Sequence, residues 1–350
     1  MEHLALDDDD NNNNNNILLL QGETTDSDSS SNNNSEGRKV VAGTSRDYVA
    51  RLRSAAARAL CQLARESQCR AAICGLGGVE RLAAVVRTAD ESIVEARGRD
   101  KAAQAIANLA ARDDAAKAAI FEANAVPALV ELLESHLRFY NNRGAGTSSS
   151  PVGGTSTSTP PQQRPLGRGA ENAAAALSNL AGGRFPSRVT AAQQIVDAGA
   201  VPLLAKLLSC GAIRGRENAA GALANLAERA ATDIVDAGAV PILVAMVDAT
   251  DDGERITERA REKAAAALRY LTFNHPRNRL VVLRAEALEP LLKLAAKCSA
   301  PPKARQHALQ ALNHLVSNDE EALRQILTFE GGPALFGPPA IEADNIDNDD

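Results

Sequence analysis

The sequence predicts an all-α protein in which a unit of three helices is repeated along the chain. Three observations indicate this fold class. One helical pattern returns at a nearly constant interval, glycine and proline occupy the same places in successive copies, and alanine dominates an apolar content that includes no tryptophan. Repetition at roughly 40 to 47 residues is typical of helical solenoids, which bury a continuous core between neighbouring repeats.

The repeat is clearest over residues 214–241, and we align it on the Asn-Leu pair at 225 and 226. On this alignment the pattern ends at residues 62, 108, 179, 225, 270 and 314, so that the intervals are 46, 71, 46, 45 and 44 residues. The long interval holds a Ser/Thr/Gly/Pro-rich stretch at about 137–166, which we expect to be a flexible insertion. We therefore expect about six repeats, of which the first and last are incomplete.

Each copy is predicted to contain the same three helices. The first ends in Asp-Ala-Gly, as at 197–199 and 236–238, where glycine can adopt the left-handed backbone that closes a helix. The second begins Ala-Val-Pro, as at 125–127, 200–202 and 239–241, where proline in the first turn loses no hydrogen bond. The third is long and alanine-rich and ends at the Asn-Leu position.

Taken together, these motifs resemble the armadillo repeat family over about residues 50–335. The resemblance implies a right-handed superhelical solenoid in which the third helix of each repeat lines a concave groove. It also implies a ladder of asparagines that hold the backbone of an extended peptide, since one amide can both donate and accept a hydrogen bond. By resemblance, the ladder residues are Asn108, Asn179 and Asn225, and Gln62, Tyr270 and His314 occupy the same position in the other copies.

We number each third helix backwards from its ladder residue, n. Position n−3 is Ala in all six copies, n−2 is Leu or Ile, and n+1 is Leu throughout. At about 100° per residue these positions cluster on one side of the helix, so we expect them to form the core.

Positions n−11 and n−7 fall within about 40° of n on the other face, and we expect them to form basic and polar stripes beside the ladder. Position n−11 is basic in every copy, and position n−7 is polar or basic in all copies except the first: Lys101, Asn172, Asn218, Lys263 and His307. From position n−11 we add four residues to the candidate groove: Arg97, Arg168, Arg214 and Arg259. An alternative is that the n−11 residues pair with acids of the adjacent repeat such as Glu171, Glu217 and Glu262. The arginines at n−9 lie on the core side, and we expect them to extend to solvent where the helix starts.

Charge is divided between the ends of the chain and its body. The formal net charge is −6, yet residues 1–36 hold nine acids and residues 330–350 hold six, with no Lys or Arg in either stretch. The body between them has 29 acidic and 38 basic residues, a net charge of plus 9. We expect disordered acidic arms at 1–37 and 338–350 on either side of a repeat array at 38–337.

The motifs that accompany catalysis do not occur in the sequence. We found no phosphate-binding loop, nucleophile elbow, zinc-protease or dinucleotide motif, and the cysteines have no metal-site spacing. We therefore expect a non-enzyme with no cofactor, no metal and no small-molecule substrate. The N-terminus lacks the features of a signal peptide, Glu2 replaces the glycine that acylation requires, and no apolar run approaches about 18 residues. We expect a cytoplasmic protein without transmembrane segment or lipid anchor, and the nucleus is the alternative location.

The predicted function is a protein-interaction scaffold or adaptor that binds an extended, acidic segment of a partner protein, because a basic groove attracts acidic peptides. One alternative is a nuclear import adaptor that reads basic signals, although the tryptophan expected at n−4 in such proteins is absent from every copy. The other alternative is binding of nucleic acid or anionic membranes by the basic body. The scarcity of aromatic residues for base stacking disfavours nucleic acid.

Overall fold

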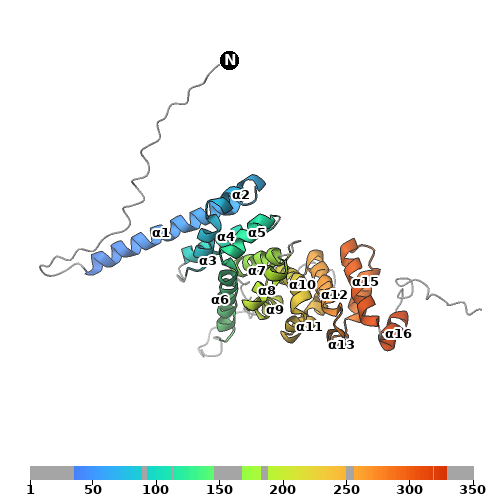
Figure 1. Ribbon diagram of the computed structural model, residues 1–350. Coiled ribbons are helices and arrows are strands. Elements are labelled where there is room, and N and C mark those ends of the chain that lie inside the picture. Colours follow the sequence, from blue (N-terminus) through green and yellow to red (C-terminus); the bar gives the residue numbers. More distant parts are fainter. Residues whose placement is uncertain are drawn as a thin grey trace, which may run out of the picture. The chain divides into compact units, whose positions relative to one another are not determined.

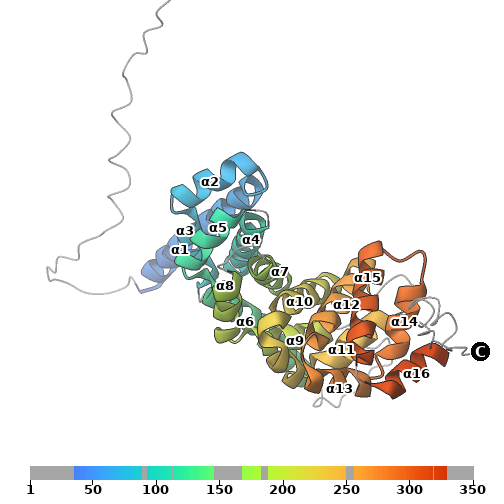
Figure 2. The same ribbon diagram turned by 45° about the vertical axis from the view of Figure 1, so that its right-hand side comes forward.

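The structure is a computed structural model that describes residues 35–88, 93–111, 113–145, 168–182, 188–249, 256–317 and 319–328. Within these ranges the chain is built from α-helices and contains no β-strand. It divides into two compact units, Met1–Arg46 and Asp47–Asp350, and the repeats belong to the second unit. We use the helix numbers of Figures 1 and 2.

The third helix of each repeat, called the groove helix below, is observed in every predicted copy. The groove helices are α1 (Ser35–Leu63), α4 (Ile93–Ala110), α7 (Arg168–Ala181), α10 (Ile213–Asp236), α12 (Glu258–Thr272) and α15 (Pro302–Val316). From α4 to α15 each packs against the next, and α7, α10, α12 and α15 follow one another in both views (Figures 1 and 2).

The second helices of the repeats are α3 (Gly78–Val86), α6 (Ala125–Ala145), α9 (Ala200–Cys210), α11 (Ala239–Asp248) and α14 (Leu288–Ala296). Each follows a residue with positive φ, which is Gly77, Gly199 or Gly238 in three repeats and Asn124 or Glu286 in the other two. The predicted left-handed closure by glycine is therefore confirmed, and asparagine or glutamate adopts the same backbone where glycine is missing.

The first helices are α2 (Ser67–Gly75), α5 (Asp114–Glu122), α8 (Arg188–Asp197), α13 (Pro276–Arg284) and α16 (Glu320–Thr328). In the remaining repeat, the end of α10 takes this role. Ala230 has the non-helical angles φ −117° and ψ 29° inside α10, so that a kink joins a groove helix to the first helix of the next repeat. Among the described helices, none alone is both long and apolar enough to cross a membrane; α10 and α11 meet those criteria only as a pair bent by 108°.

The predicted core face is confirmed in the five groove helices from α4 to α15. Their n−3 alanines have no exposed surface, and their n−2 and n+1 residues are equally buried; the alanines are Ala105, Ala176, Ala222, Ala267 and Ala311. Because the alanine side chain is small, the neighbouring helix can approach closely and dispersion contacts are dense. The array is thus held together by a continuous layer of Ala and Leu.

The same prediction is wrong for the first copy. Leu63, at n+1 of α1, is 47% exposed, Ala59 is exposed and Leu60 is only partly buried. In each later repeat a second helix precedes the groove helix and packs against it, and no described helix precedes α1. The motif is the same in all copies, but its burial depends on neighbouring helices.

The n−9 arginines also differ from the prediction. Arg261 is only 5% exposed and its Nη2 donates to the carbonyl of Ala249, directly after α11. The Arg99 Nη1 atom donates in the same way to the Thr88 carbonyl after α3, at 3.2 Å. Instead of extending to solvent, these two side chains turn back and satisfy carbonyls at the end of the second helix of their own repeat.

Two predicted boundaries need correction. Helix α6 continues to Ala145, so residues 137–145 are helical and not part of a loop, because Leu137 extends the buried series of Leu129 and Leu133. Helix α1 begins at Ser35, inside the expected N-terminal arm. The rest of the arm, residues 146–167 of the insertion and the tail from 329 lie outside the described residues, so the arms remain predictions.

Candidate functional site

The three ladder asparagines connect consecutive groove helices. The Nδ2 atom of Asn108 donates to the Cys61 carbonyl at 3.0 Å, that of Asn179 to Ala107 at 2.9 Å, and that of Asn225 to Ser178 at 2.9 Å. In each case the acceptor lies one residue before the ladder position of the preceding repeat. Each amide therefore joins two repeats through backbone.

The acceptors are carbonyls near helix ends, where intrahelical donors run out. The Ser178 carbonyl also accepts from the Gly182 N–H at 3.1 Å, but the other two acceptors have lost this usual donor. The N–H of Ala111 turns to Asn108 instead of Ala107, and the N–H of Arg65 turns to Gln62 instead of Cys61. The Ala107 and Cys61 carbonyls, which lack these intrahelical donors, accept instead from the amides of Asn179 and Asn108. This gives the ladder a structural role that the sequence analysis did not assign, since replacement of one asparagine removes a bond between repeats as well as a ligand contact.

A second row of amides repeats the arrangement seven residues earlier, at n−7. Asn172 Nδ2 donates to the Asp100 carbonyl at 2.9 Å, and Asn218 Nδ2 donates to the Glu171 carbonyl at 3.0 Å. Two helical turns separate the rows, so both face the groove side of α7 and α10. An amide has two N–H donors and an oxygen with two lone pairs, so each of these side chains keeps capacity for a ligand after its bond to the backbone.

The rows meet in a hollow of about 510 Å³ over α7, α10 and α12, which we call the polar groove. It contains four of the predicted site residues, Asn179, Asn225, Arg214 and Arg259. Asn218, Ser178, Glu217, Lys117 and Lys263 also line it. The other six predicted residues are not part of this hollow: Gln62, Asn108, Tyr270, His314, Arg97 and Arg168.

Positive charge dominates the polar groove. The one acid in its lining, Glu217, is engaged by Arg259 Nε at 3.2 Å and by the Thr257 hydroxyl at 3.0 Å. Lys117 pairs with Asp114 beside the groove. Within the described part of the chain, Arg214 and Lys263 have no ion pair within 4.0 Å, so their charges are available to an anionic ligand.

Among the selected n−11 arginines, Arg259 forms an ion pair of the kind that the alternative interpretation describes. Arg259 pairs with Glu217, and the carboxyl of Glu171 lies in the field of Arg214 and Arg168. Burial raises the pKa of Glu171, and the two arginines act against that rise. All four selected n−11 arginines are exposed, but of these four only Arg214 and Arg259 line the polar groove.

The C-terminal part of the ladder is aromatic. The Arg269 guanidinium lies 4.1 Å from the centre of the Tyr270 ring, and the Phe273 and His314 rings are 5.2 Å apart. The His314 Nδ1 atom lies 3.2 Å from the Arg269 carbonyl, which can only accept, so His314 donates as the ladder asparagines do. Burial lowers the pKa of His314, and burial with the Arg269 charge lowers that of His307.

We expect His314→Asn to reduce the acid sensitivity of the fold. Because the folded pKa of His314 lies below its ordinary value of 6.5, the unfolded chain binds the proton first and stability falls as pH drops below 6.5. An asparagine can donate to the Arg269 carbonyl without titrating. Thermal unfolding should therefore show a gap in favour of the variant that widens between pH of about 7.5 and about 5.5. A gap that stays constant over this range would contradict the assignment.

Several residues of the polar groove were not among the selected site residues. Two of them, Lys263 and Asn218, belong to the n−7 stripe that the sequence places two turns from the ladder. Gly182 and Gly221 had no signal in the sequence. A Cβ at Gly182 would lie 2.9 Å from Asn225 Nδ2, and one at Gly221 would lie 3.0 Å from the Ser178 hydroxyl, so both glycines provide space inside the groove.

Comparison with known proteins defines the class to which this solenoid belongs. Residues 191–228 match the family model described as Armadillo/beta-catenin-like repeat. An engineered protein of known crystal structure is 30% identical, with a TM-score of 0.57 over 75% of this chain and 90% of its own. A designed armadillo repeat protein is 24% identical, with a TM-score of 0.57 over 75% of this chain and 92% of its own. This chain belongs to the armadillo repeat family.

Two further relatives are of interest for function. U-box domain-containing protein 19 of Arabidopsis thaliana is 32% identical over 143 residues, which cover 41% of this chain. The chain spans only 21% of the length of that protein. A designed armadillo repeat protein in complex with the peptide (KR)4 is 22% identical, with a TM-score of 0.54 over 74% of this chain and 91% of its own, and so shares the fold.

Proposed function

We propose that the chain is a non-enzymatic interaction scaffold that binds an extended, acidic segment of a partner protein in the polar groove. The peptide backbone meets the amides of Asn179, Asn218 and Asn225, and its acidic side chains meet Arg214 and Lys263. We expect no cofactor and no small-molecule substrate at this site. Location in the cytoplasm, or alternatively the nucleus, remains a prediction from the sequence.

The observation that carries the proposal is the excess of positive charge in the lining of the polar groove. Four basic residues and one acid line it, and the acid is already engaged by Arg259 and Thr257. The amides use one N–H each and keep an oxygen for the N–H groups of a bound strand. A ligand with free backbone groups and negative side chains satisfies both sets of partners, and the basic surface speeds its association.

The designed relative in complex with (KR)4 gives the sharpest contrast, because that peptide is basic. The charge preference of this chain has to be argued from the side chains of its own groove. In this chain a basic peptide would face the charges of Arg214 and Lys263, because Glu217 is already paired with Arg259. We accordingly place the preference on acidic peptides.

A titration of the full chain with three fluorescent peptides of equal length tests the proposal. The peptides are extended sequences of about 12 residues that are acidic, neutral or basic and otherwise identical. We expect fluorescence anisotropy to show saturable binding of the acidic peptide, with an affinity that falls as salt rises. Preference for the basic peptide would indicate an import-adaptor type of groove. Binding of all polyanions alike, including DNA and anionic vesicles, would favour the basic-surface alternative.

A further inference from the structure

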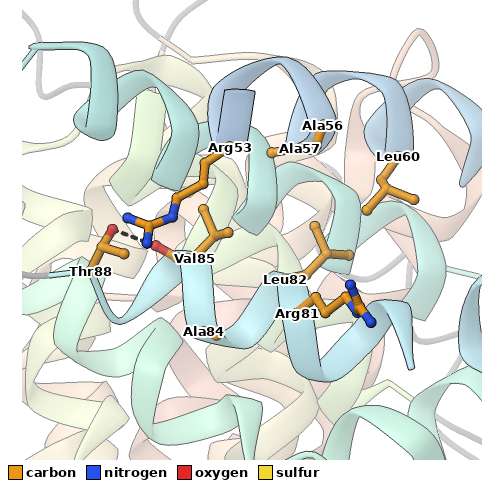
Figure 3. Close-up of a pocket in the computed structure, with 9 residues that line it drawn as sticks. All are labelled: Arg53, Ala56, Ala57, Leu60, Arg81, Leu82, Ala84, Val85 and Thr88. Atoms are coloured by element: carbon orange, nitrogen blue, oxygen red, sulfur yellow. Dashed lines mark hydrogen bonds between the residues drawn. The ribbon is translucent and has the colours of Figure 1, made fainter. Parts of the chain in front are cut away.

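A second hollow lies at the N-terminal end of the array, between α1 and α3, with a volume of about 390 Å³. In Figure 3, Leu60 points from α1 towards α3, while Leu82 and Val85 point from α3 towards α1. Ala56 lies in the wall, and Arg53 and Arg81 lie at its edges. We call this apolar space the N-terminal hollow.

The repeats show what occupies the corresponding place elsewhere. Helix α3 packs against both the groove helix α4 and the next second helix α6, and α6, α9 and α11 do the same in their repeats. The second helix of each repeat therefore packs against the groove helix of its own repeat and against the second helix of the next repeat. Between the groove helix α1 and α3 the space is the N-terminal hollow, which is the position of one second helix.

Burial at equivalent positions supports this assignment. Val85 lies eight residues after the positive-φ residue Gly77, and the residues eight after the other such turns are Leu132, Leu207, Met246 and Leu294. Those four side chains are at most 3% exposed, whereas Val85 is only partly buried. The exposed Leu63 extends the same apolar surface along α1. The surface is thus suited to cover by an apolar helix face.

The arginine at n−9 indicates how an occupant would be oriented. Arg99 and Arg261 donate to carbonyls within two residues of the ends of the second helices α3 and α11. Arg53 has the same position in α1, and its side chain is 48% exposed and reaches Glu95 at 3.1 Å. A helix in the hollow would therefore end near Arg53, where its last carbonyls need donors.

Arg81 distinguishes the N-terminal hollow from the equivalent places in the later repeats. It lies four residues after Gly77, and the corresponding residues of the later second helices are apolar: Ala128, Leu203, Ile242 and Pro290. An exposed arginine at this edge favours an occupant with a carboxylate opposite it. The hollow thus fits an amphipathic helix that combines an apolar stripe with an acidic residue.

We propose that the N-terminal hollow binds an amphipathic, acidic α-helix of a partner protein, at a site separate from the polar groove. Residues 1–34 do not contain a sequence of this kind. In residues 1–34 the aliphatic residues after Leu6 are confined to 17–20, which cannot make a stripe with helical spacing over several turns. The second helices of the described repeats are already packed within the array.

The test uses a fluorescent peptide with the sequence of residues 237–249, which contains the apolar stripe of α11 and Asp248. We expect it to bind the full chain saturably, and a peptide with Asp in place of Leu243 to bind at least tenfold more weakly, about 1.4 kcal/mol. Ala56→Glu should weaken binding by a similar factor, since it places a charge in the hollow. Arg81→Glu should weaken it as well.

Ala55→Glu is the matched control, because Ala55 is also exposed, is adjacent on α1 and does not line the hollow. Circular dichroism should show that both glutamate variants retain the helical fold. Absence of saturable binding, or equal effects of the two variants, would overturn the proposal. Light scattering tests whether the chain associates with itself. If it does, and if Ala56→Glu abolishes this association, the hollow binds a second copy of the chain instead of a partner protein. The acidic groove peptide should not compete with the helical probe.

Discussion

Replacement of Asn225 by alanine should weaken binding of the acidic peptide by about 10-fold to 100-fold and lower the free energy of unfolding by about 1 kcal/mol. Affinity falls because removal of the amide would leave peptide groups of the bound strand without a hydrogen-bond partner. The loss of stability follows because Asn225 Nδ2 donates to the Ser178 carbonyl across the repeat boundary at 2.9 Å. Peptide titration and chemical denaturation measure the two effects separately, and Asn179→Ala should behave alike.

The matched control is Asn313→Ala, which makes the same substitution at an exposed position of α15, one residue before the ladder. It should leave affinity and stability nearly unchanged. Gly182→Ala tests the same contact without altering Asn225, because the added Cβ would lie 2.9 Å from the amide nitrogen and 3.2 Å from the Ser178 carbonyl oxygen. Gly182→Ala should weaken binding of the acidic peptide, as Asn225→Ala does. Normal binding by both Asn225→Ala and Gly182→Ala would place the ligand elsewhere.

The double charge reversal Arg214→Glu with Lys263→Glu should reduce affinity for the acidic peptide by at least about tenfold at low salt. Two attractive charges become repulsive in the lining of the polar groove, while Glu217 and Arg259 keep their ion pair. The effect should lie mainly in the association rate and shrink as the Debye length falls from about 10 Å to about 3 Å with added salt. Stopped-flow kinetics at two salt concentrations gives both quantities.

A control for net charge is available on α13. Arg277→Glu with Arg284→Glu changes the total charge by the same amount, at two exposed positions of a first helix. If this variant loses as much affinity as the groove variant, the attraction comes from the overall charge of the body. Equal losses would thus contradict a localised acidic-peptide site.

The repeat architecture was predictable because its determinants are local and recur. The Ala and Leu positions follow helical periodicity, and Gly199 and Gly238 mark turns that require positive φ. The same local signals misled for α1, where Leu63 repeats the core motif but is 47% exposed. A motif determines which face of a helix is apolar, whereas burial depends on which helices lie next to it.

The candidate site was predictable only in part, since its chemistry arises between repeats. The family resemblance identified Asn179 and Asn225, but their bonds to Ala107 and Ser178 depend on how neighbouring groove helices cross. The contribution of Gly182 depends on the same crossing. The burial of Arg261 could not be inferred either, because it needs the Ala249 carbonyl at the end of another helix.

Photo-cross-linking of the bound acidic peptide tests the central claim most directly. A peptide with a photoreactive residue near its middle is bound to the full chain and irradiated, and the attachment sites are mapped by mass spectrometry. We expect attachment to the groove helices α7, α10 and α12, within residues 175–182, 214–225 and 259–263, which include most of the polar groove. Attachment confined to the second helices α9, α11 and α14 would contradict the account.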